Sequence, residues 1–137
     1  MLKQIALKAR KIRNRSGLAV SLRTRSGETA YITAKKLSAT VPLIDEPRIK
    51  QWQYWALIDN AFPYGAAFRV HHLLIPKRVV SEQALNAQEK EELPKVLAEL
   101  GQTYDCHLTN FSKKQSIKSH YHIHLLIYKR SRDQLHF

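Results

Sequence analysis

The stretch from residue 120 to residue 126 reads His-Tyr-His-Ile-His-Leu-Leu. Side chains of a β-strand alternate between its two faces, so a strand here places the three histidines on one face at steps of about 6.6 Å. The opposite face is then apolar. Burying an unpaired polar group costs about 1–3 kcal/mol, which makes three neighbouring imidazoles an odd choice for packing alone. The pattern therefore indicates a functional surface formed by His120, His122 and His124.

Two kinds of chemistry use histidines placed in this way. A His-x-His pair on a strand, together with a third histidine, is a known set of zinc ligands. Imidazoles also act as nucleophiles and as proton carriers in covalent catalysis. The residue types alone leave both interpretations open. No carboxylate accompanies the three histidines in the sequence to complete the common catalytic zinc site, and we expect neither a metal nor another cofactor.

Hydrophobic periodicity predicts further strands and one long helix around the histidines. The helix is expected to begin after Asn86, where Glu89 three residues on completes a capping-box pattern, and to run to about residue 104. Pro94 lies inside it and predicts a kink, because proline removes one backbone donor. The predicted strands cover residues 53–59, 70–75, 106–110 and 119–128.

The first 50 residues follow a different pattern, in which basic side chains dominate. Gly27 lies between two short alternating runs, which is typical of a hairpin turn. The elements expected here are a basic helix over residues 2–13, a β-hairpin with strands at 19–25 and 29–34, and a linking loop over 37–50.

A second segment, His71-His-Leu-Leu-Ile-Pro-Lys-Arg78, completes a family likeness. Together with residues 120–126 it resembles the histidine-triad superfamily of nucleotide hydrolases and transferases. In that superfamily a strand ends in Pro-Lys with a histidine six residues before the lysine, which is His71 here. The resemblance covers about residues 52–130 and does not extend over residues 1–50.

The resemblance implies an α+β fold. A five-stranded antiparallel sheet would carry the three histidines, with one main helix packed on it. We expect three parts: an N-terminal extension of helix and hairpin (1–50), a catalytic domain (51–130) and a short tail (131–137). Many members of the family are homodimers, so a homodimer is expected.

The resemblance also implies a role for each histidine. The middle one, His122, would be the nucleophile, whose Nε2 attacks the α-phosphorus of a nucleotide to form a nucleotidyl–histidine intermediate that water hydrolyses. A backbone carbonyl would hold its Nδ1–H, which leaves the lone pair on Nε2. His124 and His71 would contact phosphate oxygens, and His120 would orient the surroundings of the nucleophile.

Polar residues before the histidines are implied as contacts to the phosphate or the leaving group. Asn110 would donate its amide there, with Gln115 nearby. Ser116 matches the Gln-Ser position of the family, but it lies four residues before His120, one more than the usual spacing. Ser119 therefore competes with it for the contact to the leaving group.

The end of the strand at 53–59 is implied to bind the ribose hydroxyls, through Asp59 or Asn60. The twelve-residue step from Asp59 to His71 departs from the family, whose loop is commonly shorter. The run Asn-Ala-Phe-Pro-Tyr at residues 60–64 resembles the transferase branch more than the compact phosphoramidases. The ribose contact is thus open between these two residues.

The charge of the chain is concentrated near its start. Its 137 residues contain 23 basic and 11 acidic side chains, a net charge of +12. Residues 1–40 hold ten basic residues and the single acid Glu28, a net +9, which leaves +3 for the rest. A basic segment of this kind is typical of nucleic-acid binding. An alternative function follows, in which residues 1–40 present RNA or DNA, including adenylylated or capped ends, to the histidine domain.

Composition excludes several other classes of protein. The single cysteine, Cys106, rules out an intramolecular disulfide and a cysteine-based zinc finger. No apolar run approaches the ~20 residues of a transmembrane helix, and no secretory signal is expected at the start. We therefore expect a cytoplasmic protein that does not associate with membranes, and the resemblance implies that it is an enzyme acting on a nucleotide with a purine base.

Overall fold

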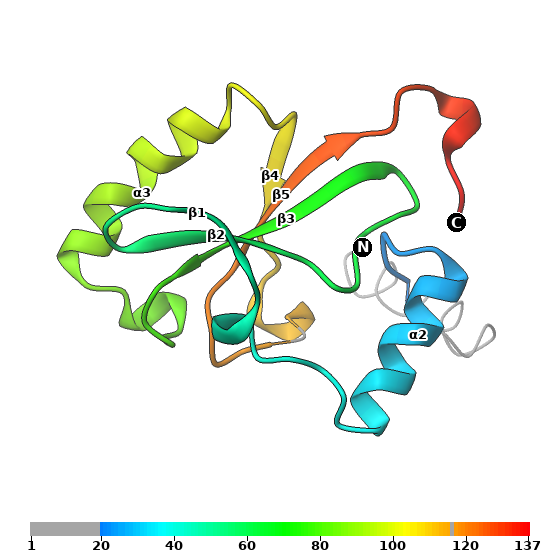
Figure 1. Ribbon diagram of the computed structural model, residues 1–137, viewed down its shortest axis with the longest axis horizontal. Helices are drawn as coiled ribbons and strands as arrows, with labels where there is room; N and C mark the ends of the chain where they lie inside the picture. Colours follow the sequence, from blue (N-terminus) through cyan, green and yellow to red (C-terminus); the bar gives the residue numbers. More distant parts are fainter. Residues whose placement is uncertain (1–19, 116) are drawn as a thin grey trace, which may run out of the picture.

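The structure, a computed structural model, describes residues 20–115 and 117–137 of the chain (Figure 1). Its helices and strands, labelled as in Figure 1, are α2 (Arg25–Lys36), β1 (Arg48–Gln51), β2 (Trp55–Asp59), β3 (Phe68–Pro76), α3 (Ala87–Leu100), β4 (Cys106–Leu108) and β5 (Ile123–Tyr128). Short 3₁₀ turns at Leu43–Asp45, Glu82–Ala84, Ser112–Lys114 and Arg132–Gln134 connect them. The predicted helix over residues 2–13 lies outside the described residues.

The five strands form one antiparallel sheet in the order β1-β2-β3-β5-β4. The expected α+β architecture is confirmed. β3 is the longest strand, with nine residues, and it pairs with both β2 and β5. Its register sets Leu73 opposite His124 and His71 opposite Leu126, so the two family-like segments of the sequence lie side by side at the centre of the sheet.

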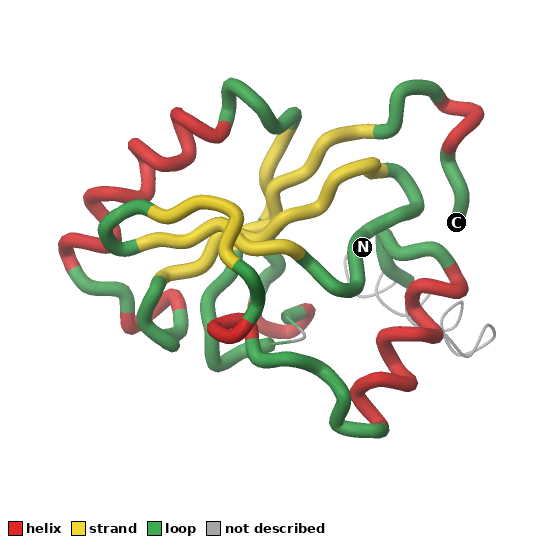
Figure 2. Tube along the Cα trace, in the orientation of Figure 1, coloured by secondary structure: helices red, strands yellow, loops and turns green. Residues whose placement is uncertain are grey.

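The two faces of the sheet bury different residues. On one face, apolar side chains of β2, β3 and β5 pack against Val96 and Leu100 of α3. On the other, Leu43 covers a smaller apolar cluster of the sheet. The histidines at even positions of residues 120–124 belong to this second face, because Tyr121 and Ile123 point to the first. Figure 2 shows the two helices on either side of the sheet, with α2 away from α3.

Helix α3 begins as the sequence predicts. Asn86 accepts a hydrogen bond from the backbone N–H of Glu89, and the Glu89 carboxylate accepts from the N–H of Asn86. The same carboxylate is buried and forms a two-pronged ion pair with Arg78, at 3.0 and 2.7 Å. The helix ends at Leu100, earlier than expected, and the kink at Pro94 stays a prediction.

The predicted β-hairpin is wrong. Residues Arg25–Lys36 form helix α2, and residues 20–24 precede it without strand structure. The alternating Thr29, Tyr31 and Thr33 produced a strand-like pattern, but the N-terminal cap at Thr24 favours a helix. Thr24 caps the N-terminus by accepting from the N–H of Gly27, at 3.0 Å. The glycine expected in a hairpin turn thus belongs to the first turn of a helix.

Two other boundaries also differ from the expectation. The last strand begins at Ile123 rather than at residue 119, so His120 and His122 lie just before the strand and outside it. The segment 37–50, expected to be a linking loop, contains β1 at the edge of the sheet and the buried Leu43. Part of the sheet and core therefore comes from the first 50 residues. Within the described part of the chain, no helix has the length and apolarity to cross a bilayer.

Ser38 turns the chain from α2 back towards the sheet. Its φ of 53° lies in the left-handed region, where a residue with a Cβ is strained. The Ala39 N–H donates to the carbonyl of Ala34 (2.8 Å), and the Ser38 N–H donates to that of Lys35 (3.1 Å), which is a Schellman ending. This ending places the following residues, from Thr40 onward, beside the histidines.

Replacing Ser38 by glycine is expected to raise the free energy of unfolding by about 0.5–1 kcal/mol, because glycine adopts positive φ without strain. Ser38→Val is expected to lower it, since a β-branched side chain fits this conformation worst. Denaturant unfolding of the two variants measures the difference. A Ser38→Gly protein less stable than the parent would contradict the strain assigned to this position.

Candidate active site

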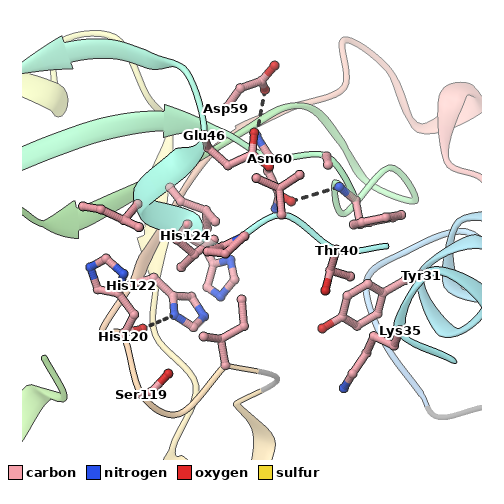
Figure 3. Close-up of a pocket in the computed structure, with 18 of the residues that line it drawn as sticks. Tyr31, Lys35, Thr40, Glu46, Asp59, Asn60, Ser119, His120, His122 and His124 are labelled. Carbon is pink, nitrogen blue, oxygen red and sulfur yellow. Dashed lines mark hydrogen bonds between the residues drawn. The ribbon is translucent and has the colours of Figure 1, made fainter. Parts of the chain in front are cut away.

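A cavity of about 330 Å³ opens on the face of the sheet away from α3 (Figure 3). Three parts of the chain line it: the histidine segment with the end of β4, the end of β2 with the loop that follows, and the chain from α2 to the 3₁₀ turn at Leu43–Asp45. Of the residues predicted as site residues, the cavity is lined by Asp59, Asn60, Asn110, Ser119, His120, His122 and His124.

His122 has the geometry of a neutral nucleophile. Its Nδ1–H donates to the backbone carbonyl of His120 at 2.9 Å, as expected, so the neutral ring keeps its lone pair on Nε2. The side chain is buried, and this burial lowers the pKa of His122, with only partial opposition from the same hydrogen bond. His122 is therefore unprotonated at neutral pH.

A chain of hydrogen bonds fixes the protons of His71 and His124. The backbone N–H of Tyr64 donates to Nδ1 of His71 (2.8 Å), so the neutral ring of His71 carries its proton on Nε2. That Nε2–H donates to Nδ1 of His124 (2.8 Å), which places the proton of His124 on its own Nε2. Among the described residues this buried Nε2–H has no partner. It is a donor without an acceptor at the edge of the cavity.

The pKa values agree with neutral rings throughout this chain. Burial, together with the neighbouring His124 and Arg23, lowers the pKa of His71 to about 2. Burial likewise lowers the pKa of His124 to about 3, with help from His122 and Arg23. Protonating either ring would place a buried positive charge beside others.

His120 acts on the backbone rather than on the cavity. Its Nε2 is the donor to the carbonyl of Pro76 at 2.8 Å, which ties the segment before β5 to the end of β3. The carbonyl of His120 itself holds Nδ1 of His122. The first histidine thus positions the second.

Asn110 and Ser119 line the cavity, whereas Gln115 does not. The Nδ2 of Asn110 donates to the Tyr64 hydroxyl at 3.4 Å, a long bond. The Nε2 of Gln115 donates to the backbone carbonyl of Asn110 at 2.9 Å and so fixes this stretch of chain. Ser116 lies outside the described residues, which leaves Ser119 as the described serine at the cavity.

Asp59 and Asn60 line the opposite end of the cavity. Asn60 is engaged inside the protein: its Oδ1 accepts from the Phe62 N–H (3.0 Å), and its Nδ2 lies 3.1 Å from Nδ1 of His71. Asp59 is exposed, and its Oδ1 accepts from the N–H of Asn60 at 2.8 Å and lies 4.0 Å from Nε2 of His72. Of the two candidates for a ribose contact, Asp59 has the freer oxygen.

Several residues of the cavity were not predicted. Arg23, Tyr31, Lys35 and Thr40 belong to the segment interpreted as a basic extension, yet they form one wall of the cavity. Tyr64 stacks on His124, with ring centroids 4.9 Å apart. The only sequence signal for this wall was Tyr31 and Lys35 at helical spacing, which the strand interpretation obscured.

The ring nitrogens do not form a metal site. One nitrogen of His120 and one of His122 are used on backbone carbonyls, and His124 is bound to His71. Across residues 20–115 and 117–137, no three His, Cys, Asp or Glu side chains are placed to hold one ion. The alternative of three converging zinc ligands does not fit this arrangement.

No protein-family model and no curated protein matches the sequence. Among solved structures, the chain is similar to a histidine triad protein from Clostridium difficile (16% identical, 73% of this chain and 91% of that one, TM-score 0.48). It is also similar to a HIT family hydrolase from Legionella pneumophila Philadelphia 1 (18% identical, 73% and 93%, TM-score 0.47). A HIT family hydrolase from Clostridium thermocellum is 21% identical, over 74% and 91% of the two chains, with a TM-score of 0.44. The functional conclusion rests on the chemistry of the cavity.

Because His71 and His124 are buried as neutral rings, the free energy of unfolding should decrease as the pH falls. The folded pKa values of His71 and His124 lie below the ordinary 6.5, so the unfolded chain binds more protons. Their full contribution is present above pH 6.5 and is lost as the pH falls below it. Between pH 6.5 and 5 the free energy of unfolding should decrease by up to about 1.4 kcal/mol per pH unit for each histidine.

Denaturant unfolding across this pH range measures the slope, and His124→Gln should reduce it by about one proton. The exposed His136→Gln serves as the control. A slope unchanged by His124→Gln would show that this ring is not held neutral in the folded protein.

Proposed function

We propose that the protein is a nucleotide hydrolase or nucleotidyl transferase of the histidine-triad type, acting at an α-phosphate through a covalent intermediate on His122. One observation carries the proposal. Within the part of the chain that the structure describes, His122 has a neutral ring whose Nε2 lone pair is free, and His124 has a buried N–H donor without a partner; both line the same cavity. A nucleophile beside an unpaired donor matches the needs of phosphoryl or nucleotidyl transfer.

In this mechanism Nε2 of His122 attacks the α-phosphorus, and the bond from phosphorus to the leaving group breaks with its electron pair on the leaving group. The Nε2–H of His124 donates to a non-bridging phosphate oxygen, whose charge it stabilises in the transition state. Water, or another acceptor in a transferase, then attacks the phosphorus and releases His122. His71 holds the proton of His124 in the direction of the cavity.

The rest of the cavity supports a nucleotide. Asn110 and Ser119 are proposed to contact the phosphate or leaving group, and Asp59 the ribose hydroxyls. Apolar side chains of Leu43 and Leu73 line the same cavity and suit a flat purine base. The homodimer and the cytoplasmic location stay predictions.

Replacing His122 by alanine is expected to lower the turnover of adenosine 5′-phosphoramidate at least about 10³-fold, because the nucleophile is lost. Exposed His107 on β4 offers a matched control, and His107→Ala should keep its activity. Mass spectrometry of the wild type, quenched by denaturation at alkaline pH where the phosphorus–nitrogen bond survives, should find an adenylyl group on His122. Unchanged turnover in His122→Ala would reject the nucleophile and with it the proposed function.

We propose nucleic-acid binding as a second candidate function, with residues 1–40 presenting RNA or DNA ends to the cavity. The observation that favours it is the position of α2, whose Arg25, Lys35 and Lys36 belong to the basic segment and whose inner face lines the cavity. Phosphate contacts release counterions, so affinity should fall steeply with salt.

Fluorescence anisotropy with a labelled 5′-adenylylated oligonucleotide tests this candidate. We expect the affinity to fall at least about tenfold between 50 and 200 mM salt. An affinity that does not change over this range would contradict phosphate-driven binding by the basic segment.

A further inference from the structure

The charged groups of the cavity are separated in space. The carboxylates of Glu46 and Asp59 lie together at the end near Asn60 (Figure 3). The cations Arg23 and Lys35 come from the chain around α2. Figure 3 shows Lys35 and Tyr31 across the cavity from the segment that carries His120 and His122. A substrate held at the histidines would therefore have the cationic wall on its far side.

Arg23 is already occupied within the protein. Its Nη1 lies 3.2 Å from the buried carboxylate of Glu28, and its Nε–H donates to the carbonyl of Phe62 at 2.9 Å. Its guanidinium also lies over the ring of Tyr31, 4.2 Å from the centroid. These contacts anchor α2 to the loop after β2, so Arg23 positions the wall.

Among the described residues, Lys35 is not held by an ion pair of this kind. Its side chain is exposed, and its Nζ lies 5.3 Å from the ring centroid of Tyr31, one helical turn earlier. Within residues 20–115 and 117–137, it makes no ion pair with a carboxylate. Tyr31 is itself held between Arg23 and Phe62, whose ring lies 5.1 Å away. The ammonium group of Lys35 thus lies beside a tyrosine ring that is itself held in place.

We propose that Lys35 binds a phosphate on the leaving group, so that the substrate is a nucleotide whose leaving group is itself a phosphate or polyphosphate rather than an amine. The inference rests on the proposed function. In-line displacement sends the leaving group away from the attacking nitrogen, and Lys35 lies across the cavity from the segment that bears His122.

The chemistry of the step explains the preference. The bond from His122 Nε2 to the α-phosphorus forms as the bridging bond from that phosphorus to oxygen breaks, and the electron pair stays on the oxygen of the leaving phosphate. This oxygen gains negative charge in the transition state, which an ammonium group stabilises. Water then cleaves the phosphorus–nitrogen bond, giving a nucleoside monophosphate and free His122. An amine leaves without a negative charge and gains nothing from Lys35.

The test compares substrates that share an AMP group. The value of kcat/KM is measured for adenosine 5′-phosphoramidate, for ATP and for a 5′-adenylylated oligonucleotide, whose leaving groups are an amine, pyrophosphate and a terminal phosphate. The proteins are the wild type, Lys35→Gln, Lys35→Arg, and Lys36→Gln as the control. Lys36 is the neighbouring exposed cation of α2, and it does not line the cavity.

Lys35→Gln is expected to lower kcat/KM about tenfold for ATP and for the oligonucleotide, the change that one charge-assisted hydrogen bond produces. The phosphoramidate should change less than about twofold, and Lys35→Arg should restore most of the loss. Lys36→Gln should match the wild type on ATP and on the phosphoramidate, neither of which carries a nucleic-acid chain. Comparing the wild-type kcat/KM for ATP with that for the oligonucleotide shows whether the preferred leaving group is pyrophosphate or the terminal phosphate of a nucleic acid.

An equal loss on all three substrates, or no loss on any, would overturn the inference while leaving the proposed function intact. A wild type inactive on all three, with no adenylyl group trapped on His122, would instead reject the proposed function and the inference together. Thermal unfolding of each variant separates a loss of folding from a loss of recognition.

Discussion

The hydrogen bond from Nε2 of His71 to Nδ1 of His124 joins strands β3 and β5 and sets the direction of the protons on both rings. Its direction is imposed from outside, because the backbone N–H of Tyr64 can only donate and therefore makes Nδ1 of His71 an acceptor. From that single constraint follow the tautomers of both rings and a donor on His124 that faces the cavity. A backbone group in a loop thus determines the hydrogen-bonding character of an active-site imidazole on a strand.

Burying these histidines costs free energy unless their ring nitrogens form hydrogen bonds. Four histidines are buried on or beside one face of the sheet, and all four are bound to neighbours inside the protein. Only Nε2 of His124 among their buried side-chain nitrogens has no partner in the described part of the chain. An unsatisfied buried donor costs about 1–3 kcal/mol, and a bound phosphate oxygen would remove that cost. An acceptor oxygen bound to this nitrogen would thus stabilise the folded protein.

The sequence was most informative where function and local pattern coincide. Alternation at residues 120–124 predicted correctly which side chains share a face, although β5 begins only at Ile123, because Tyr121 packs in the same apolar cluster as Ile123 and Leu125. The capping box at Asn86 and Glu89 was also predicted, since its hydrogen bonds are local. The wall of the cavity formed by Arg23, Tyr31, Lys35 and Thr40 was not predicted. Its place in the cavity depends on Arg23 binding the carbonyl of Phe62, 39 positions away, and no periodicity encodes such a contact.

The same contact explains why a strongly basic segment and a nucleophilic histidine coexist. A cation near a neutral imidazole opposes its protonation, and Arg23 contributes in this way to the lowered pKa of both His71 and His124. Arg23 is itself held by its ion pair with Glu28, and from this position its charge acts on the histidines. The wall of the cavity that contains Arg23 therefore also favours the neutral state of His71 and His124.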